Sequence, residues 1–280
     1  MRFASFRRPD GTTSFGRVEG DRLVDLGTAD HADLKAAIAA DALASLGNGG
    51  ASFALADVVL LPALPNPGKI LCVGHNYESH RQETGRAKVA HPSIFTRWAD
   101  TLIAHGQPIV RPRLSTDLDF EGELAVVIGR GGRGITEDNA LAHVAGYACF
   151  NDASVRDWQW HTTQFTPGKN FPATGALGPW LVTPDEAGDL ADVHVTTRVN
   201  GTVMQDQPIR DMIFPIARII AYVSAFTPLS AGDVIATGTP GGVGAKRTPP
   251  SWLKAGDRVE IAIGPIGTLS NTVIDEAALD

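Results

Sequence analysis

The sequence predicts an α+β fold in which strands dominate. Short apolar runs separated by turn residues fill most of the chain, and 30 Gly and 18 Pro among 280 residues supply those turns. The few helical stretches do not alternate regularly with the strands, as they would in a doubly wound sheet. Hydrophobic residues make up 43% of the chain, so it can bury a sizeable core.

The charge balance and composition exclude several classes of protein. Lys and Arg number 24 against 31 Asp and Glu, a net charge of −7 that argues against a nucleic-acid binder. No apolar stretch approaches the ~18 residues that a membrane span requires, so no membrane partner is expected. Cys72 and Cys149 lie in apolar runs without metal-ligand spacing, and the first residues lack a secretory signal pattern. We therefore expect a cytoplasmic protein with reduced, buried thiols.

Residues 1–65 are expected to form a small N-terminal β/α domain. Residues 3–6 and 14–26 alternate like strands, and residues 31–46 have the Ala/Leu-rich spacing of a helix. Three prolines within residues 62–68 can continue neither a helix nor a strand ladder, so the main domain is expected to span residues 66–280.

The main domain shows the pattern of many short strands. The predicted strands are 70–73, 123–128, 146–150, 180–182, 194–199, 234–237 and 258–263. The predicted helices are 137–144, 153–164 and 212–226. Asn200-Gly201 between two apolar runs predicts a two-residue hairpin turn.

A run of carboxylates leads into one of these predicted strands. In an extended chain Asp117, Asp119, Glu121 and Glu123 project from one face and repel one another. A divalent cation held by oxygen ligands would offset that repulsion, whereas a solvated acidic strand edge is the simpler alternative. Asp152 follows another buried strand, where it could join a metal site or merely cap the next helix.

Three further residues carry candidate chemistry. His80 and Glu83 share one helical face, where the carboxylate can orient the imidazole as a general base, unless they belong to an ordinary polar surface turn. Lys169 is a lone cation in an uncharged stretch, suited to a substrate oxygen or simply exposed.

Two glycine-rich stretches are weighed separately. Residues 237–244 lack the Gly-Lys-Ser/Thr ending of a phosphate loop, but their backbone N–H groups and the Thr239 hydroxyl could bind a small carboxylate. Residues 129–134 match G-x-G-x-x-G, yet the strand before them carries carboxylates where a dinucleotide fold needs an apolar strand. A turn is the better prediction for that stretch.

Five motifs in this order resemble those of the fumarylacetoacetate hydrolase family, over about residues 69–274. They are Gly74-His75-Asn76-Tyr77 with His80 and Glu83; Asp119-Phe120-Glu121-Gly122-Glu123-Leu124; Asn151-Asp152 with Arg156-Asp157-Trp158-Gln159; Gly168-Lys169-Asn170-Phe171; and the glycine-rich stretch 232–244. The resemblance implies a mixed β-roll core, a Mg²⁺ or Mn²⁺ site, a small-molecule 2-oxo acid substrate and usually a homodimer.

The resemblance also implies roles for individual residues. The implied metal ligands are Glu121, Glu123 and Asp152; the implied catalytic residues are His80, Glu83 and Lys169; and the implied substrate-binding residues are Tyr77, Arg156, Gln159 and Thr239. His80 and Glu83 would activate water on a lid that orders over the substrate. Phe95-Thr96-Arg97-Trp98 departs from the Lys-Pro pair of many members, and Arg97 is expected near the entrance with Arg81, Arg86 and Lys88.

Because the His80–Glu83 pair is complete, we expect a metal-dependent hydrolase that cleaves a C–C bond in a 2,4-dioxo acid. An acylpyruvate-like or sugar-derived diketo acid would give pyruvate and a second acid. The alternative is an oxaloacetate decarboxylase, or an isomerase or decarboxylase of 2-hydroxymuconate-type ring-cleavage dioates. A non-catalytic binding protein is the remote alternative.

Overall fold

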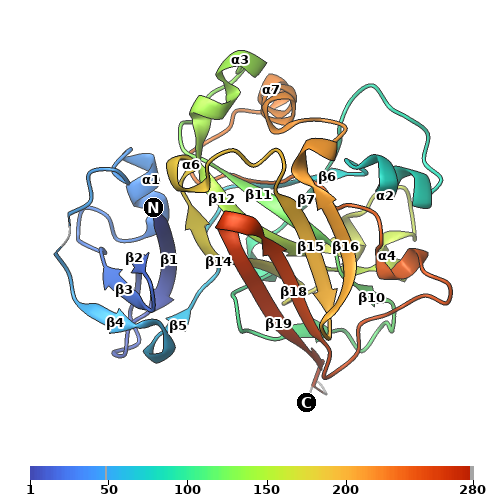
Figure 1. The fold of residues 1–280 in the computed structure, drawn as a ribbon, viewed down its shortest axis with the longest axis horizontal. Helices are drawn as coiled ribbons and strands as arrows, with labels where there is room; N and C mark the ends of the chain where they lie inside the picture. The colour runs from blue at the N-terminus through green and yellow to red at the C-terminus, as the bar shows by residue number, and fades with distance from the viewer. Residues whose placement is uncertain (48, 278–280) are drawn as a thin grey trace.

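The computed structural model describes residues 1–47 and 49–277. Its centre is a mixed twelve-stranded sheet (Figure 1). In spatial order its main path runs through β4 (Ser52–Ala54), β3 (Arg22–Asp25), β2 (Thr13–Glu19), β1 (Arg2–Arg7), β14 (Gly175–Val182), β12 (Val144–Asp152), β11 (Gly122–Ile128), β17 (Val234–Ala236), β6 (Ile70–Gly74) and β7 (Ser93–Arg97). Two short strands pair alongside this path, β5 (Val59–Leu60) on β1 and β8 (Leu102–Ile103) on β14.

A second sheet of five strands packs against the first. Its order is β16 (Thr202–Pro208), β15 (His194–Val199), β18 (Arg258–Ile263), β19 (Gly267–Asp275) and β9 (Ile109–Arg111). A separate short ladder joins β10 (Leu118–Asp119) to β13 (Ser154–Val155). The fold is therefore mostly β with a few helices, as the sequence predicts.

Strand β11 is buried on both faces, which explains its continuous apolar run. Leu124 and Val126 share a core cluster with residues of the second sheet, and Ala125 and Val127 share another with the N-terminal strands. Side chains alternate along a strand, so Glu123 lies on the same face as Ala125 and Val127. A buried carboxylate therefore begins an otherwise apolar face.

The predicted strands are all present, with β17 ending one residue early. The predicted hairpin is confirmed: Asn200 and Gly201 have φ values of 51° and 81°, the left-handed pair that a tight turn between β15 and β16 needs.

The helices are shorter than the sequence suggests. They are α1 (Leu34–Ala39), α2 (Glu78–Glu83), α3 (Glu137–Ala140), α4 (Arg156–Gln159), α5 (Thr166–Lys169), α6 (Pro184–Ala187) and α7 (Ile216–Phe226). The prediction of one helix over 153–164 is wrong, because Ser154 and Val155 pair with β10 and only one helical turn follows. The α7 helix begins after Pro215, which lacks the N–H that an earlier turn would need.

The N-terminal segment continues the central sheet. Strand β1 pairs antiparallel with β14, through Arg2 with Val182 and Phe3 with Leu181. Phe3 and Leu34 lie in the same hydrophobic cluster as Phe150 of β12. In Figure 1 these first strands, in blue, flank one side of the molecule. None of the helices in the described ranges has the length and apolar character needed to cross a bilayer.

Candidate metal and acid–base site

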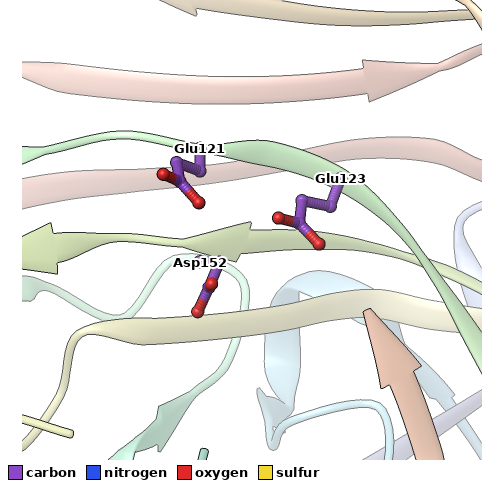
Figure 2. Close-up of side chains that lie close together, drawn as sticks. All are labelled: Glu121, Glu123 and Asp152. Carbon is purple, nitrogen blue, oxygen red and sulfur yellow. The ribbon is translucent and has the colours of Figure 1, made fainter. Parts of the chain in front are cut away.

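Three carboxylates meet where β11 begins and β12 ends. The two strands are antiparallel neighbours, with Gly122 opposite Asn151, so Glu121 and Glu123 lie beside Asp152. One oxygen from each carboxylate lies within 4.8 Å of the others, and all three residues are buried (Figure 2). The structure thus brings together the three expected metal ligands.

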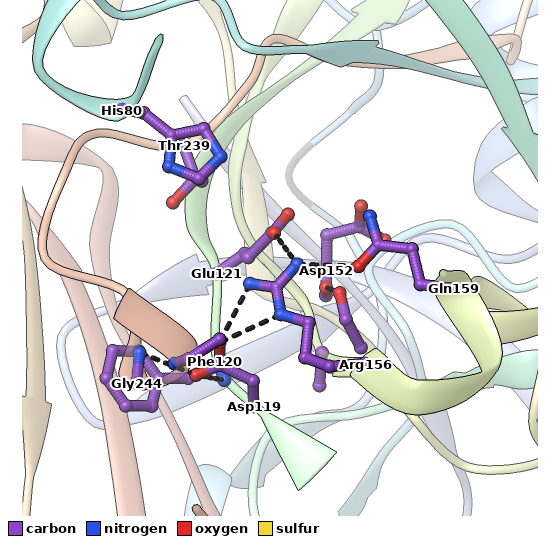
Figure 3. Close-up of polar contacts among 12 residues, drawn as sticks. His80, Asp119, Phe120, Glu121, Asp152, Arg156, Gln159, Thr239 and Gly244 are labelled. Carbon is purple, nitrogen blue, oxygen red and sulfur yellow. Dashed lines mark hydrogen bonds and ion pairs between the residues drawn. The ribbon is translucent and has the colours of Figure 1, made fainter. Parts of the chain in front are cut away.

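Asp119 does not join that cluster, although the alternating pattern puts it on the same face. Its carboxylate accepts hydrogen bonds from the backbone N–H groups of Gly244 (2.8 Å) and Ala245 (3.0 Å), and from Arg156 Nε at 2.9 Å (Figure 3). The strand is interrupted between β10 and β11, which separates Asp119 from the three ligands. Its carboxylate instead secures the glycine-rich segment and Arg156.

Protein cations lie against the acidic cluster. Lys169 Nζ bridges Glu121 Oε2 at 2.7 Å and Asp152 Oδ2 at 2.6 Å. Arg156 Nη1 lies 2.6 Å from Glu121 Oε1. Burial alone would lower the pKa of Lys169, but the Asp152 and Glu121 carboxylates raise the pKa above its ordinary value. Lys169 is therefore a charged ammonium within the cluster.

The placement of Arg97 corrects the expectation that it lies near the site entrance. Its side chain is fully buried, and Nε donates to Asp152 Oδ1 at 2.7 Å. The other guanidinium nitrogens donate to the Ala153 carbonyl and the Thr174 hydroxyl. No local pattern around Arg97 indicates this contact, because Asp152 lies 55 positions further along the chain.

The charges of the cluster fit a divalent cation. The carboxylates of Asp119, Glu121, Glu123 and Asp152 outnumber the three buried cations by one negative charge. Glu123 has no cationic partner among the described residues; its Oε2 accepts only the Gly238 N–H. Burial, followed by Asp152 and Glu121, raises the pKa of Glu123 well above its ordinary value. Hard oxygen ligands with surplus negative charge are what Mg²⁺ and Mn²⁺ require.

A buried imidazole, paired with a half-buried carboxylate, lines the same cavity. His80 Nδ1 lies 2.7 Å from Glu83 Oε1 on α2, and Gly242 N–H donates to Glu83 Oε2 at 2.8 Å. An ionised carboxylate only accepts hydrogen bonds, so His80 Nδ1 carries the proton and Nε2 can take another. Ser79 ties the helix to the same glycine-rich segment, because its Oγ accepts the Gly241 N–H.

His75 also lies on the cavity wall, where the sequence reasoning gave it no role of its own. Its ring stacks on His80, with centroids 5.1 Å apart and planes 13° apart. Burial, and then His80, lower the pKa of His75 to about 4, so it stays neutral near pH 7. Its φ of 55° lies in the left-handed region. No spacing rule marked this residue, because the contact depends on that backbone geometry.

The cavity has a volume of about 70 Å³, which suits a small acid rather than a dinucleotide. Gln159 lines it, and its Oε1 accepts a hydrogen bond from Arg156, leaving its NH₂ group without a partner among the described residues. The Thr239 hydroxyl is already engaged by Gly122 O and Gln205 Nε2. The Thr239 backbone N–H has no partner in the described ranges and remains the group that could bind a ligand.

Tyr77 is not brought to the cavity wall. It lies in the main hydrophobic cluster with no exposed surface, and its hydroxyl finds no hydrogen-bond partner within the described chain. Burial, and then Glu123, raise the pKa of this hydroxyl. Tyr77 therefore borders the acidic cluster from the core side.

The sequence matches a family model and proteins named as oxaloacetate tautomerases. Residues 69–274 match the model of the fumarylacetoacetate (FAA) hydrolase C-terminal family. The chain is 42% identical over 229 residues to the oxaloacetate tautomerase YisK of Bacillus subtilis, covering 80% of this chain and 76% of that protein. It is 40% identical over 220 residues to the human mitochondrial oxaloacetate tautomerase FAHD2A, covering 78% and 70%.

Solved structures share the whole architecture. A fumarylacetoacetate hydrolase from the psychrophile Exiguobacterium antarcticum matches with a TM-score of 0.88 and 36% identity, covering 99% of this chain and 100% of that one. A 2-hydroxyhepta-2,4-diene-1,7-dioate isomerase from Mycobacterium marinum matches with a TM-score of 0.82 and 32% identity, with the same coverage. With its acidic centre and its similarity over most of its length, the chain belongs to the fumarylacetoacetate hydrolase family.

Proposed function

We propose that this protein is a Mg²⁺- or Mn²⁺-dependent enzyme that interconverts the enol and keto forms of a 2-oxo acid. The observation that carries the proposal is that His80, oriented by Glu83, lines the same cavity as Glu121 and Glu123 of the acidic centre. Two relatives named as oxaloacetate tautomerases and a structural neighbour named as a dioate isomerase favour proton transfer over the hydrolysis expected from the sequence.

The chain's own residues can move the proton. His80 Nε2 would take a proton from C3 of the keto acid. The C3–H electron pair then forms the C2–C3 double bond, the C2=O π pair moves onto oxygen, and that oxygen takes the proton back from His80 Nε2 to give the enol. Glu83 keeps the imidazole in the tautomer that this step needs. A bound divalent cation supplies Lewis-acid stabilisation of the charge that develops on the C2 oxygen.

Three groups are suited to hold the substrate during that step. The unpartnered NH₂ of Gln159 and the Thr239 backbone N–H can bind the first carboxylate of the acid. Lys169, held as an ammonium by Glu121 and Asp152, supplies positive charge beside the reacting oxygen. These donors are fixed by buried contacts, so little reorganisation accompanies the reaction.

Hydrolytic C–C cleavage of a 2,4-dioxo acid is the second candidate. The same His80–Glu83 pair could instead activate a water that attacks the distal carbonyl, releasing pyruvate and a second acid. Decarboxylation of oxaloacetate would need the charge stabilisation but no water-activating base. These reactions differ in product and can be separated directly.

The test uses the purified protein with Mg²⁺ or Mn²⁺ and two assays. One follows the ultraviolet absorbance of enol oxaloacetate as it converts to the keto form, and the other measures pyruvate release from acylpyruvates, oxaloacetate and ring-cleavage dioates. We expect the enol-to-keto conversion to be faster than pyruvate release. His80→Ala should lower the conversion rate by about 10²–10⁴-fold, the usual effect of losing a general base. His194→Ala is the matched control, because His194 pairs with Asp206 at an exposed site. Pyruvate release from acylpyruvates that outpaces the enol conversion would replace tautomerisation by hydrolysis.

We also propose that the protein is a homodimer, on the strength of the family resemblance. Light scattering during size-exclusion chromatography should then give twice the chain mass of 29.6 kDa. A mass equal to one chain would contradict it.

A further inference from the structure

The rim of the cavity carries two cations that no described residue neutralises. Deeper in the cavity, Arg156 and Lys169 are paired with buried carboxylates. Arg86 and Lys246 also line the cavity, but both are exposed, and neither has an ion pair or a side-chain hydrogen bond among the described residues. The only carboxylates on the cavity wall, within those residues, are Glu121 and Glu123 of the acidic centre.

The two rim cations come from different segments. Arg86 follows α2, the helix that carries His80. Lys246 ends a 3₁₀ turn, Gly244–Lys246, directly after the glycine-rich segment. Lys246 Nζ lies 5.3 Å from the centroid of the Trp160 ring, a contact that holds the ammonium over the rim. Trp160 is itself 49% exposed and lines the cavity. The rim therefore combines a held ammonium, a guanidinium and an aromatic surface.

Other cations near α2 do not share this position. Arg81 lies 2.6 Å from Glu78 in an ion pair and does not line the cavity. Lys88 lines a separate cavity, which shares only His75 with the first. The unpaired positive charge on the active-site rim is thus a feature of two particular residues and not of the whole segment.

We propose that Arg86, Lys246 and Trp160 form a subsite for the second carboxylate of a 2-oxo dicarboxylate. The enzyme would then select dianionic 2-oxo acids over 2-oxo monocarboxylates of the same length. The proposal rests on the proposed function, which assigns the first carboxylate to Gln159 and Thr239 and the 2-oxo group to the cation at the acidic centre. Exposed cations at a cavity mouth also attract dianions from solution, an effect that salt screens.

Binding measurements test the subsite without depending on turnover. Isothermal titration with Mg²⁺ present would compare 2-oxoglutarate with 2-oxopentanoate, and 2-oxoadipate with 2-oxohexanoate, on wild type, Arg86→Met, Lys246→Met and Lys88→Met. Wild type should favour each dicarboxylate. Each rim variant should reduce that preference about fivefold, the upper range for a solvent-exposed ion pair, without weakening the monocarboxylates. Lys88→Met removes an equal charge outside the cavity and should keep the preference.

The outcomes distinguish the two proposals. If both rim variants keep the wild-type preference while 2-oxo acids still bind, the subsite is wrong and the proposed function stands. Equal weakening of mono- and dicarboxylates would also overturn the subsite, because it would show a role in the first carboxylate's site. If no 2-oxo acid binds wild type with Mg²⁺, the proposed function fails, and the subsite fails with it.

Discussion

Arg97 shows how a single buried side chain can hold a charged site together. It is the cation on Asp152 Oδ1, and it also satisfies the Ala153 carbonyl and the Thr174 hydroxyl. Removing one partner of a buried ion pair leaves an uncompensated charge, which costs more than the pair itself contributes. Asp152 would then keep only Lys169 as a cationic neighbour.

We therefore expect Arg97→Met to lower the free energy of unfolding by about 3–5 kcal/mol. Arg97→Lys keeps the charge but cannot reproduce the planar set of donors, so an intermediate loss is expected. Urea unfolding of wild type and of both variants, with and without Mg²⁺, gives the losses in unfolding free energy. A loss for Arg97→Met no larger than that of an ordinary surface substitution would contradict the structural role.

His75 should make the folded protein sensitive to acid. Its folded pKa of about 4 lies below the ordinary 6.5, mainly because burial disfavours the charged imidazolium. The nearby His80, Arg86 and Lys169 lower the pKa further, whereas the Glu121 carboxylate raises it. The unfolded chain binds the proton more tightly, so this contribution to stability is present above pH 6.5 and is lost as the pH falls towards 4.

We expect His75→Asn to lose less unfolding free energy than wild type as the pH falls, since Asn tolerates the left-handed backbone and does not titrate. Unfolding free energies of both proteins at several values between pH 7.5 and 4 provide the measurement. Relative to wild type, the unfolding free energy of the variant should rise as the pH falls below 6.5. Parallel pH curves would show that His75 does not contribute.

The residues that could be read from the sequence are those with a local pattern. Glu121, Glu123, His80 and Glu83 have spacings that dictate a shared face on a strand or a helix, so their proximity follows from backbone geometry. Arg97 meets Asp152 only through the fold, across 55 positions of chain. Such contacts depend on strand order, which no local spacing encodes.

At the scale of elements, α2 is held more by side-chain contacts than by its own length. Its six residues are too few to be stable alone. Ser79 Oγ accepts from Gly241 N–H and donates to Gln207 Oε1, and Glu83 accepts from Gly242 N–H. The position of the helix therefore depends on the glycine-rich segment.

Ser79→Ala should loosen that attachment without touching His80. We expect the amides of α2 to exchange hydrogen about five- to tenfold faster, because losing the hydrogen bonds to Gly241 and Gln207 costs about 1–1.4 kcal/mol together. Hydrogen exchange followed by mass spectrometry resolves this segment. Ser45→Ala, which removes a single contact to Ala42 O in the N-terminal segment, is the control and should leave α2 unchanged. Unaltered exchange in Ser79→Ala would mean that other contacts suffice.

The helix lengths were the least predictable elements, for identifiable reasons. The stretch 153–164 is rich in Trp and Thr, which lose side-chain freedom in a helix, and Val155 is taken by a strand pairing. In α1 the helix starts at the Asp33 cap and is followed by Asp41 in a left-handed conformation. Composition indicated helix in both places, and tertiary pairing and local backbone geometry shortened it.

At the scale of the whole molecule, the N-terminal segment and the main body share one sheet and one core. Residues 1–65 were expected as a separate small domain, and that division stays a prediction about folding units. Because β1 covers the edge of β14, removing the segment would uncover a strand edge and the apolar residues beneath it. We expect a 66–280 fragment to aggregate, as measured by soluble yield and light scattering, and a monodisperse fragment would show that the main body folds alone.

Metal binding should stabilise the whole fold, since the surplus negative charge lies in its core. At a Mg²⁺ concentration 100 times its Kd, binding should raise the free energy of unfolding by about 2.7 kcal/mol. Thermal unfolding of chelator-treated protein, with Mg²⁺ titrated back, should show this for wild type and not for Glu123→Gln. Glu137→Gln, an exposed carboxylate in α3, is the matched control and should behave like wild type. An equal Mg²⁺ response in Glu123→Gln would remove Glu123 from the site.

The hydrogen bond from Gly242 to Glu83 would make the proposed chemistry depend on where α2 lies. The carboxylate that orients His80 is itself held by a backbone group of another segment, so displacing α2 would keep Glu83 beside His80 but remove the Gly242 N–H from it. Glu83 would then be freer to turn away from the imidazole, so the base proposed at His80 would be oriented best while α2 contacts the glycine-rich segment.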